Sequence, residues 1–592
     1  MGWNSFFHDR TGKGGLRIAG YMRIGFALMF LIDRIMMLFQ LDELFNPEYG
    51  LMPYRITSQN YQLSDWNQYS LFSFFPESMI FVWTMAGIGI LQGFILLLGA
   101  TNYLRFHMFG LYINIMSFQN HNALLWDGED NMFRIWVILF LFLPLDHCTI
   151  YDRFGFGSQP PSCSWPLTTS WPMWPIRLFQ FEVSIIYVGA SLGKLAMPYW
   201  QDGSSIYRLT YGIDDYPGIF NPEFLYGRYG PLLIMSYSSL FLEGVCYMTV
   251  WIPPLRTLSV VLMVVLHIGI DLGMNMHMFE WLSILGWCVF LIQPKAANYN
   301  AIKVPETKDH ADTEPSADIN NKSKMSIVGS FFWKTLVNLY VIFFTVSIML
   351  DCLPYKEVTV WLPTSTRASW KNFIKKKEEF FETKLDPYLT AVGLSQQGDW
   401  GMYSNVVVNE DVWRIDAELT NGTIVRSIWR SPNWHEYTNW ERKFHCRTMN
   451  YFGAVLEEKL ELEHLIGLKT KPFIDEHPNT QTLFYVTESV THAKIKMEST
   501  GGFWDPVVKH PMNVYEEENS MILNRQKDGE FVVTFFQPND DGAEEVTDFD
   551  PEYDYEGDPD WDYDFGDDDD EYDDDDDVDD DYESDPSQSD EL

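Results

Sequence analysis

Long apolar segments recur along residues 17–353, separated by short polar stretches. A helix needs about 20 predominantly apolar residues to cross a hydrocarbon core roughly 30 Å thick. The pattern therefore predicts an all-α polytopic membrane bundle of about nine transmembrane helices. Five segments are clear (78–98, 231–252, 258–273, 279–292 and 331–353), and four carry polar residues (17–39, 104–125, 132–145 and 176–197).

The pattern changes after residue 353. Residues 366–385 and 451–468 place apolar side chains at helical spacing. Residues flanking Asn421-Gly422 alternate between apolar and polar, and that dipeptide is typical of a tight hairpin turn. Residues 483–497 and 531–536 also have the composition of strands. These features predict a small α+β domain with β-hairpins over residues 354–540.

Composition supports this division into an apolar and a polar half. Aromatic residues make up 16% of the 592 residues, yet the mean hydropathy is only −0.14. Of the 82 acidic residues, 29 lie in residues 541–592, where no Lys or Arg occurs. The chain shows no basic stretch suited to phosphate contacts, and we therefore expect no nucleic-acid partner. Six Cys are too few for a disulfide framework.

The last residues form an acidic tail. Residues 541–588 contain too few apolar side chains to fold, and we expect them to be disordered. The tail either serves only to solvate the chain or buffers calcium, because dense carboxylates bind Ca²⁺ weakly and in number. An acidic run followed by a retrieval-like signal resembles the C-terminal organisation of lumenal calcium-storage proteins, which favours calcium buffering. Its densest run includes Asp567, Asp568, Asp569 and Asp570.

Charges at the N-terminus predict the orientation. Arg10, Lys13 and Arg17 flank the first apolar segment, and no cleavable signal peptide precedes it, so we expect residues 1–16 to be cytosolic. Nine crossings then place the polar half in the lumen. Asn421 lies in an Asn-Gly-Thr sequon and is the expected glycosylation site, whereas Asn321 lies in a sequon that we place in the cytosol.

The C-terminus predicts the compartment. Residues 589–592 read Ser-Asp-Glu-Leu, close to the Lys-Asp-Glu-Leu signal that returns proteins to the endoplasmic reticulum. Chance is the alternative in so acidic a tail. Because the odd number of crossings independently predicts a lumenal C-terminus, we expect a multi-pass protein of the endoplasmic reticulum membrane, in contact with membrane lipid.

Ionisable residues inside membrane segments indicate function by default, because they are costly there. Arg23, Asp33 and Arg34 lie in the first segment, and Arg23 and Asp33 share a helix face without touching. They therefore need partners on other helices. Structural ion pairs are the alternative to a functional role.

Lys194 lies in the fifth segment after a stretch of small residues that permits close helix contact. Burial would favour the neutral amine, which can act as a base. A catalytic lysine of this kind requires burial with no carboxylate beside it. The alternative is a lysine that extends to the membrane surface.

His267 and Asp271 lie one turn apart on one face of the seventh segment. A carboxylate beside an imidazole fixes its tautomer and raises its basicity, although a purely structural polar pair is equally compatible with this spacing. The few scattered histidines exclude a di-iron desaturase, and the sequence contains no phosphate-binding loop.

Several motifs, taken in order over residues 17–450, resemble the horizontally transferred transmembrane domain family, which includes the vitamin K-dependent γ-glutamyl carboxylases. The opening residues 16–53, the Asn120-His121 dipeptide with Pro144-Leu-Asp-His147, the segment from Tyr187 to Gly203, and the residues after His267 carry the resemblance. The polar region around Asn421-Gly422 is similar to the family's lumenal strands.

The resemblance implies a function. Lys194 would be the base that deprotonates vitamin K hydroquinone, and O₂ and CO₂ would be co-substrates in the carboxylation of Glu in a secretory peptide or protein. His147 would act near the carboxylation step. The resemblance also implies cofactor binding near Asn120, His121, His267 and Asp271. The alternative is a non-catalytic or repurposed family member that binds a lipid or quinone and buffers calcium with its tail.

Overall fold

The computed structural model describes most of the helical half and much of the polar half. Residues 146–169, 207–228, 295–323, 396–408, 432–458 and 537–592 lie outside the described part, as do 1–2, 61–68, 100–102, 122–127, 202, 204, 274–275, 354, 493–495, 501–502, 508–512 and 528. The expectations for His147, Asn321, the acidic tail and the last four residues therefore concern residues outside the described part.

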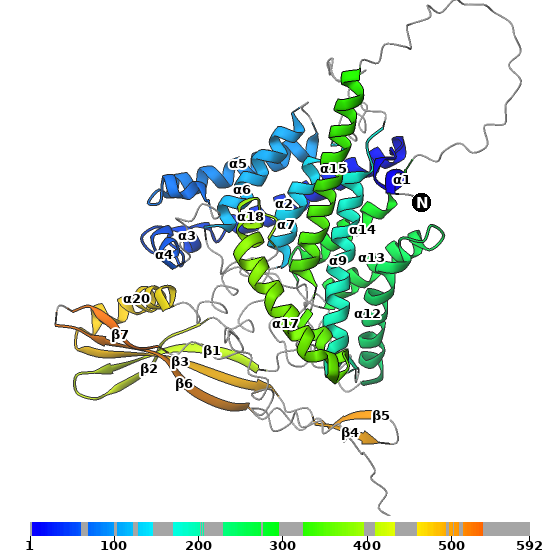
Figure 1. Cartoon of the computed structure of the whole chain (residues 1–592). Helices are drawn as coiled ribbons and strands as arrows, with labels where there is room; N and C mark the ends of the chain where they lie inside the picture. Colours follow the sequence, from blue (N-terminus) through cyan, green and yellow to red (C-terminus); the bar gives the residue numbers. More distant parts are fainter. Residues whose placement is uncertain are drawn as a thin grey trace, which may run out of the picture. The chain divides into compact units, whose positions relative to one another are not determined.

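In the described part of the chain, six helices are long and apolar enough to cross a membrane, as a helical membrane protein requires. The prediction of nine crossings is not confirmed. The six are α2 (Lys13–Leu38), α5 (Met79–Leu98), α9 (Trp174–Ala196), α12 (Tyr229–Thr249), α13 (Arg256–Gly273) and α15 (Lys324–Cys352) (Figure 1).

Three expected crossings correspond to shorter helices in the structure. These are α6 (Leu104–Gln119), α7 (Gly128–Leu141), and α14 (Phe279–Trp287) with the 3₁₀ turn η4 (Cys288–Leu291). All side chains of α7 from Met132 to Phe140 are buried. A helix surrounded by protein can be apolar on every face without matching the thickness of a bilayer, so these three segments are not confirmed as crossings.

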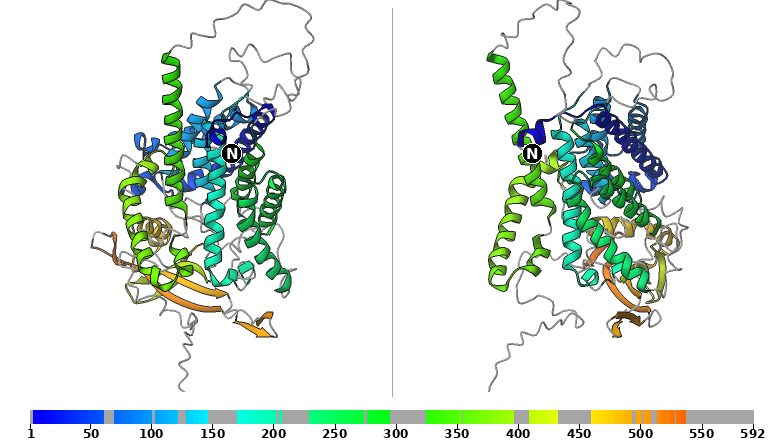
Figure 2. Two further views of the ribbon diagram at one scale, coloured as in Figure 1. Left: turned by 45° about the vertical axis from the view of Figure 1, so that its right-hand side comes forward. Right: turned by 90° about the vertical axis from the view of Figure 1, so that its right-hand side faces the viewer.

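The outer helices expose large apolar side chains. Ile80 on α5 is 81% exposed, Phe241 on α12 is 63% exposed and Val265 on α13 is 61% exposed. Exposed apolar surface of this extent indicates contact with lipid rather than water. Helix α9 differs, because 83% of the residues in its most apolar 18-residue stretch are buried. It packs against α12 and α15 (Figures 1 and 2).

The polar half contains a five-stranded antiparallel sheet in the order β2-β1-β3-β6-β7. The predicted hairpin is confirmed, since Asn421-Gly422 connects β1 to β2 and Gly422 adopts φ +77°. The strands are β1 (Asn409–Leu419), β2 (Ile424–Arg430), β3 (Thr480–His492), β6 (Asn513–Arg525) and β7 (Phe531–Phe536), and β4 (Lys496–Thr500) with β5 (Phe503–Val507) form a separate pair.

Both predicted helices of the polar half are present. Residues 366–385 lie in α17 (Thr364–Phe380) and the π-helical turn η6 (Phe381–Leu385), followed by α18 (Asp386–Ala391). Helix α20 (Lys459–Glu476) overlaps the helix predicted at 451–468 and shares a buried core with β1, β3 and β6. Short helical segments are α1 (Trp3–His8), α3 (Leu41–Phe45), α4 (Tyr54–Asn60), η1 (Leu71–Phe74), α10 (Pro198–Gln201), α16 (Tyr355–Val358) and η5 (Thr359–Trp361).

Candidate functional site

Lys194 is buried near the C-terminal end of α9. Its side chain is only 7% exposed, and Nζ lies 2.8 and 2.6 Å from the two carboxylate oxygens of Glu243 on α12. The ring of Trp200 lies 5.0 Å from the same nitrogen. The alternative of a lysine that extends to the membrane surface is therefore wrong. The expectation that no carboxylate would lie beside a buried Lys194 is also wrong.

Small residues bring the two helices of this pair together. A Cβ added at Gly244 on α12 would lie 4.0 Å from the Cβ of Ser191 on α9. Ser191 belongs to the small-residue stretch that precedes Lys194, and small side chains allow helix backbones to approach closely inside a membrane. The approach lets Glu243 reach across to Lys194, and the low-dielectric interior strengthens the resulting ion pair.

A second buried group combines three helices. Tyr187 on α9 hydrogen-bonds through its hydroxyl to Nε2 of His267 on α13, and Nδ1 of His267 hydrogen-bonds to Glu280 on α14. The three residues are 4%, 3% and 2% exposed, respectively. The expected pairing of His267 with Asp271 is wrong, because Tyr187 and Glu280 occupy both ring nitrogens.

The order of donors and acceptors in this group forms a proton relay. The Tyr187 hydroxyl donates to His267, and His267 donates from its other ring nitrogen to the Glu280 carboxylate. A carboxylate that holds an imidazole in this way increases the ability of the imidazole to accept a proton. The Glu280 carboxylate therefore fixes the orientation and the tautomer of the His267 ring.

The relay and the ion pair lie along one helix. Tyr187 and Lys194 are seven residues apart on α9, which is about two helical turns and places them on the same face. The Lys194–Glu243 pair and the Tyr187–His267–Glu280 group are thus two buried polar groups about 10 Å apart along α9.

Asn120 and His121 lie in a different place. His121 Nε2 is 2.9 Å from the Met52 carbonyl oxygen, and the Asn120 amide donates to the Tyr69 carbonyl at 2.8 Å. Aromatic rings surround the buried imidazole, with centroids at 4.9 Å for Phe45, 5.1 Å for Phe72 and 5.5 Å for Tyr54. Among the described residues, neither Lys194 nor His267 contacts His121. The expected cofactor-binding residues therefore form two groups, with Asn120 and His121 in one and His267 in the other.

The first segment also finds its partners. Arg23 is buried and donates to the carbonyl oxygen of Leu145, just after α7, while Arg34 Nε lies 3.3 Å from Asp33. Arg23 therefore contacts a backbone carbonyl outside its own helix, and not a side chain on another helix as expected. Asn421 is exposed at the tip of the β1–β2 turn, where its side chain accepts from the Thr423 amide.

Sequence reasoning missed Glu243, Glu280 and the hydroxyl of Tyr187. Both carboxylates lie in segments that we considered clear because their mean hydropathy is high. The rule that a charge inside a membrane segment marks a site applies to each of them as much as to Lys194. It would have identified Glu243 and Glu280, although not the residues with which they pair.

Comparisons with known proteins add no identification. No protein-family profile, no curated protein and no solved structure matches this chain.

Proposed function

We propose that the chain is a multi-pass membrane enzyme that carries out proton transfer in the buried site of α9, α12, α13 and α14. The observation that supports this most directly is the Lys194–Glu243 pair, since a buried ionisable pair in a lipid-facing bundle is costly and marks a functional site. By the resemblance of its motifs, the reaction is of the vitamin K-dependent γ-glutamyl carboxylase type.

Because Glu243 lies beside Lys194, the lysine does not meet the condition for a neutral amine that acts alone. In this proposal, Lys194 and Glu243 instead act together as one base. The pair holds one proton between the amine and the carboxylate, and in a low-dielectric interior the ionic and neutral arrangements are closer in free energy than in water. When the pair accepts the proton of a hydroquinone hydroxyl, it gains one positive charge. That charge then stabilises the hydroquinone anion beside it.

The relay of Tyr187, His267 and Glu280 complements the pair. A hydrogen-bonded Tyr–His–Glu chain can orient the hydroxyl of a bound aromatic substrate and pass a proton away from it. Burial of all three groups keeps water from the reacting centre. We propose that the substrates are vitamin K hydroquinone, O₂, CO₂ and a Glu-containing secretory peptide or protein.

The cellular setting follows from the same interpretation. We propose that the enzyme lies in the endoplasmic reticulum membrane with its N-terminus cytosolic and its C-terminus lumenal. This orientation requires an odd number of crossings, and so at least one crossing besides the six long helices of the described part, such as the shorter apolar helix Phe279–Leu291. The exposed sequon at Asn421 and the terminal Ser-Asp-Glu-Leu support this orientation. The lumenal side is also where secretory peptides would meet the enzyme.

One observation favours a second function. Glu243 already neutralises Lys194, and an ion pair of this geometry is also what a non-catalytic helical bundle would contain. In that case the chain is a repurposed member of the family that binds a lipid or a quinone, with an acidic tail that buffers calcium.

The decisive experiment measures incorporation of ¹⁴CO₂ into a Glu-rich peptide by the purified full-length protein in lipid nanodiscs. Incorporation should depend on vitamin K hydroquinone, and the quinone epoxide should form in parallel. The Lys194→Ala variant should lose both products, whereas Lys375→Ala, at an exposed lysine of α17, should retain them. Hydroquinone binding without either product would favour the second function.

A further inference from the structure

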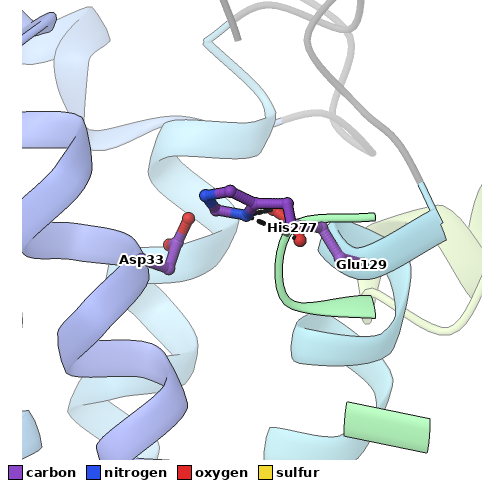
Figure 3. A group of neighbouring side chains, drawn as sticks. All are labelled: Asp33, Glu129 and His277. Atoms are coloured by element: carbon purple, nitrogen blue, oxygen red, sulfur yellow. Dashed lines mark hydrogen bonds and ion pairs between the residues drawn. The ribbon is translucent and has the colours of Figure 1, made fainter. Parts of the chain in front are cut away.

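A separate group of metal-ligating side chains lies outside the site described above. Asp33 comes from α2, Glu129 from the first turn of α7, and His277 from the loop before α14. One ligand atom from each residue lies within 4.8 Å of the other two, and all three residues are buried (Figure 3). The combination of one imidazole and two carboxylates is a common ligand set for metal ions.

The structure orients the imidazole of His277. Its Nδ1 lies 2.7 and 2.8 Å from the two oxygens of Glu129, and the Met278 amide donates to Glu129 at 2.6 Å. The other ring nitrogen lies on the side of Asp33 (Figure 3). The imidazole therefore lies between the two carboxylates.

The backbone of His277 adopts an unusual conformation. Its φ of +50° lies in the left-handed region, where a residue with a Cβ is disfavoured by about 1–2 kcal/mol. The hydrogen bonds to Glu129 from both His277 and Met278 hold the loop in that conformation. The loop therefore presents the ring to the two carboxylates at a conformational cost.

Charge balance also favours a cation here. Asp33 and Glu129 are each 1% exposed, and buried carboxylates need compensating positive charge. Arg34 lies 3.3 Å from Asp33 and offsets one of the two negative charges. A bound cation would offset the remaining negative charge.

We propose that Asp33, Glu129 and His277 bind a divalent transition-metal ion, with zinc as the representative member. Imidazole nitrogen with carboxylate oxygen suits zinc and its neighbours better than the all-oxygen sets preferred by calcium and magnesium. Zinc bonds to such ligands are about 2.0–2.2 Å long, so binding would draw the three side chains closer together. Three protein ligands leave one position of a tetrahedral ion open.

The test uses the full-length protein in nanodiscs after removal of metal by a chelator. Zinc binding is measured by calorimetry in the presence of millimolar calcium, which occupies weak carboxylate sites such as those of the tail. Bound Mn²⁺ is then examined by pulsed electron paramagnetic resonance for coupling to imidazole nitrogen. Residues 541–592 contain no His, so nitrogen coupling cannot come from the tail.

We expect one equivalent of zinc and a nitrogen coupling in the native protein. The His277→Asn variant should abolish the coupling and weaken zinc binding by at least about tenfold, and asparagine tolerates the left-handed backbone at this position. Asp33→Asn should weaken binding similarly, while His107→Asn, on α6, should have no effect. Monodispersity on gel filtration identifies variants that fold.

Three results would overturn the proposal. They are no zinc binding by the native protein, binding with no coupling to nitrogen, and binding that survives His277→Asn. In the first case His277 itself supplies the positive charge as an imidazolium between the two carboxylates.

Discussion

The ammonium group of Lys194 is held by both carboxylate oxygens of Glu243, at 2.8 and 2.6 Å, and each side chain is less than one-tenth exposed. The pair joins α9, which is mostly buried, to α12, which faces lipid with much of its surface. Removing one partner and removing both should have different effects, since an unpaired buried charge is much more costly than an apolar replacement.

Glu243→Ala should therefore destabilise the protein by about 3–5 kcal/mol, the loss typical when one member of a buried ion pair is removed. The double variant Lys194→Met with Glu243→Leu should recover most of that stability without recovering carboxylation. Thermal unfolding in detergent and ¹⁴CO₂ incorporation measure the two properties separately. Full activity in the double variant would show that the pair is structural only.

Tyr187→Phe tests the relay. The phenylalanine ring can keep the packing against Trp287, whose ring centroid lies 5.1 Å away, but it cannot donate to His267. If the relay takes part in proton transfer, turnover should fall by about 10²–10⁴-fold, whereas the loss of stability should stay within about 1–3 kcal/mol. Tyr247→Phe, at a half-buried tyrosine of α12, is the matched control. Equal turnover of the two variants would exclude Tyr187 from the chemistry.

Much of the fold could be predicted from the sequence because the responsible physical effects are local. The helical membrane half follows from runs of apolar residues, and the β1–β2 hairpin follows from Asn421-Gly422, where Gly422 adopts a positive φ. The predicted number of nine crossings is not confirmed in the described part of the chain. Hydropathy cannot distinguish a helix buried in protein, such as α7, from one that contacts lipid.

The candidate site was predicted in part. Lys194 and His267 were found because a charge in an apolar segment stands out in a single sequence. Their partners depend on which helices pack together, and that is a property of the tertiary structure. Spacing suggested Asp271 for His267, but helix packing brings Glu280 to the imidazole instead.

The contact between α20 and the loop after α3 should depend on pH. His464 Nε2 donates to the Gly50 carbonyl at 2.9 Å, and burial lowers the pKa of His464 below its ordinary value of 6.5. Since the unfolded chain binds the proton more readily than the folded one, this histidine favours folding fully only above about pH 6.5. The contribution is lost as the pH falls from there toward the lower folded pKa.

Hydrogen exchange of the α20 amides should therefore accelerate on acidification from pH 7.5 to about pH 5, after correction for the intrinsic effect of pH. The His464→Gln variant lacks the titrating group and should lose most of this dependence. His477→Gln, at the C-terminal end of the same helix, is the control. Identical profiles for the native protein and His464→Gln would assign the pH response to other groups.

The orientation can be tested at Asn421. Its side chain is exposed in the β1–β2 turn, so the oligosaccharyl transferase can reach it if the sheet is lumenal. Protein made in the presence of microsomes should shift in electrophoretic mobility, and endoglycosidase treatment or Asn421→Gln should remove the shift. The Asn321→Gln variant should still be shifted, because α15 crosses the membrane between residue 321 and the sheet and so leaves Asn321 in the cytosol if the sheet is lumenal. A glycan on Asn321 with Asn421 unmodified would instead place the loop before α15 in the lumen and reverse the proposed topology.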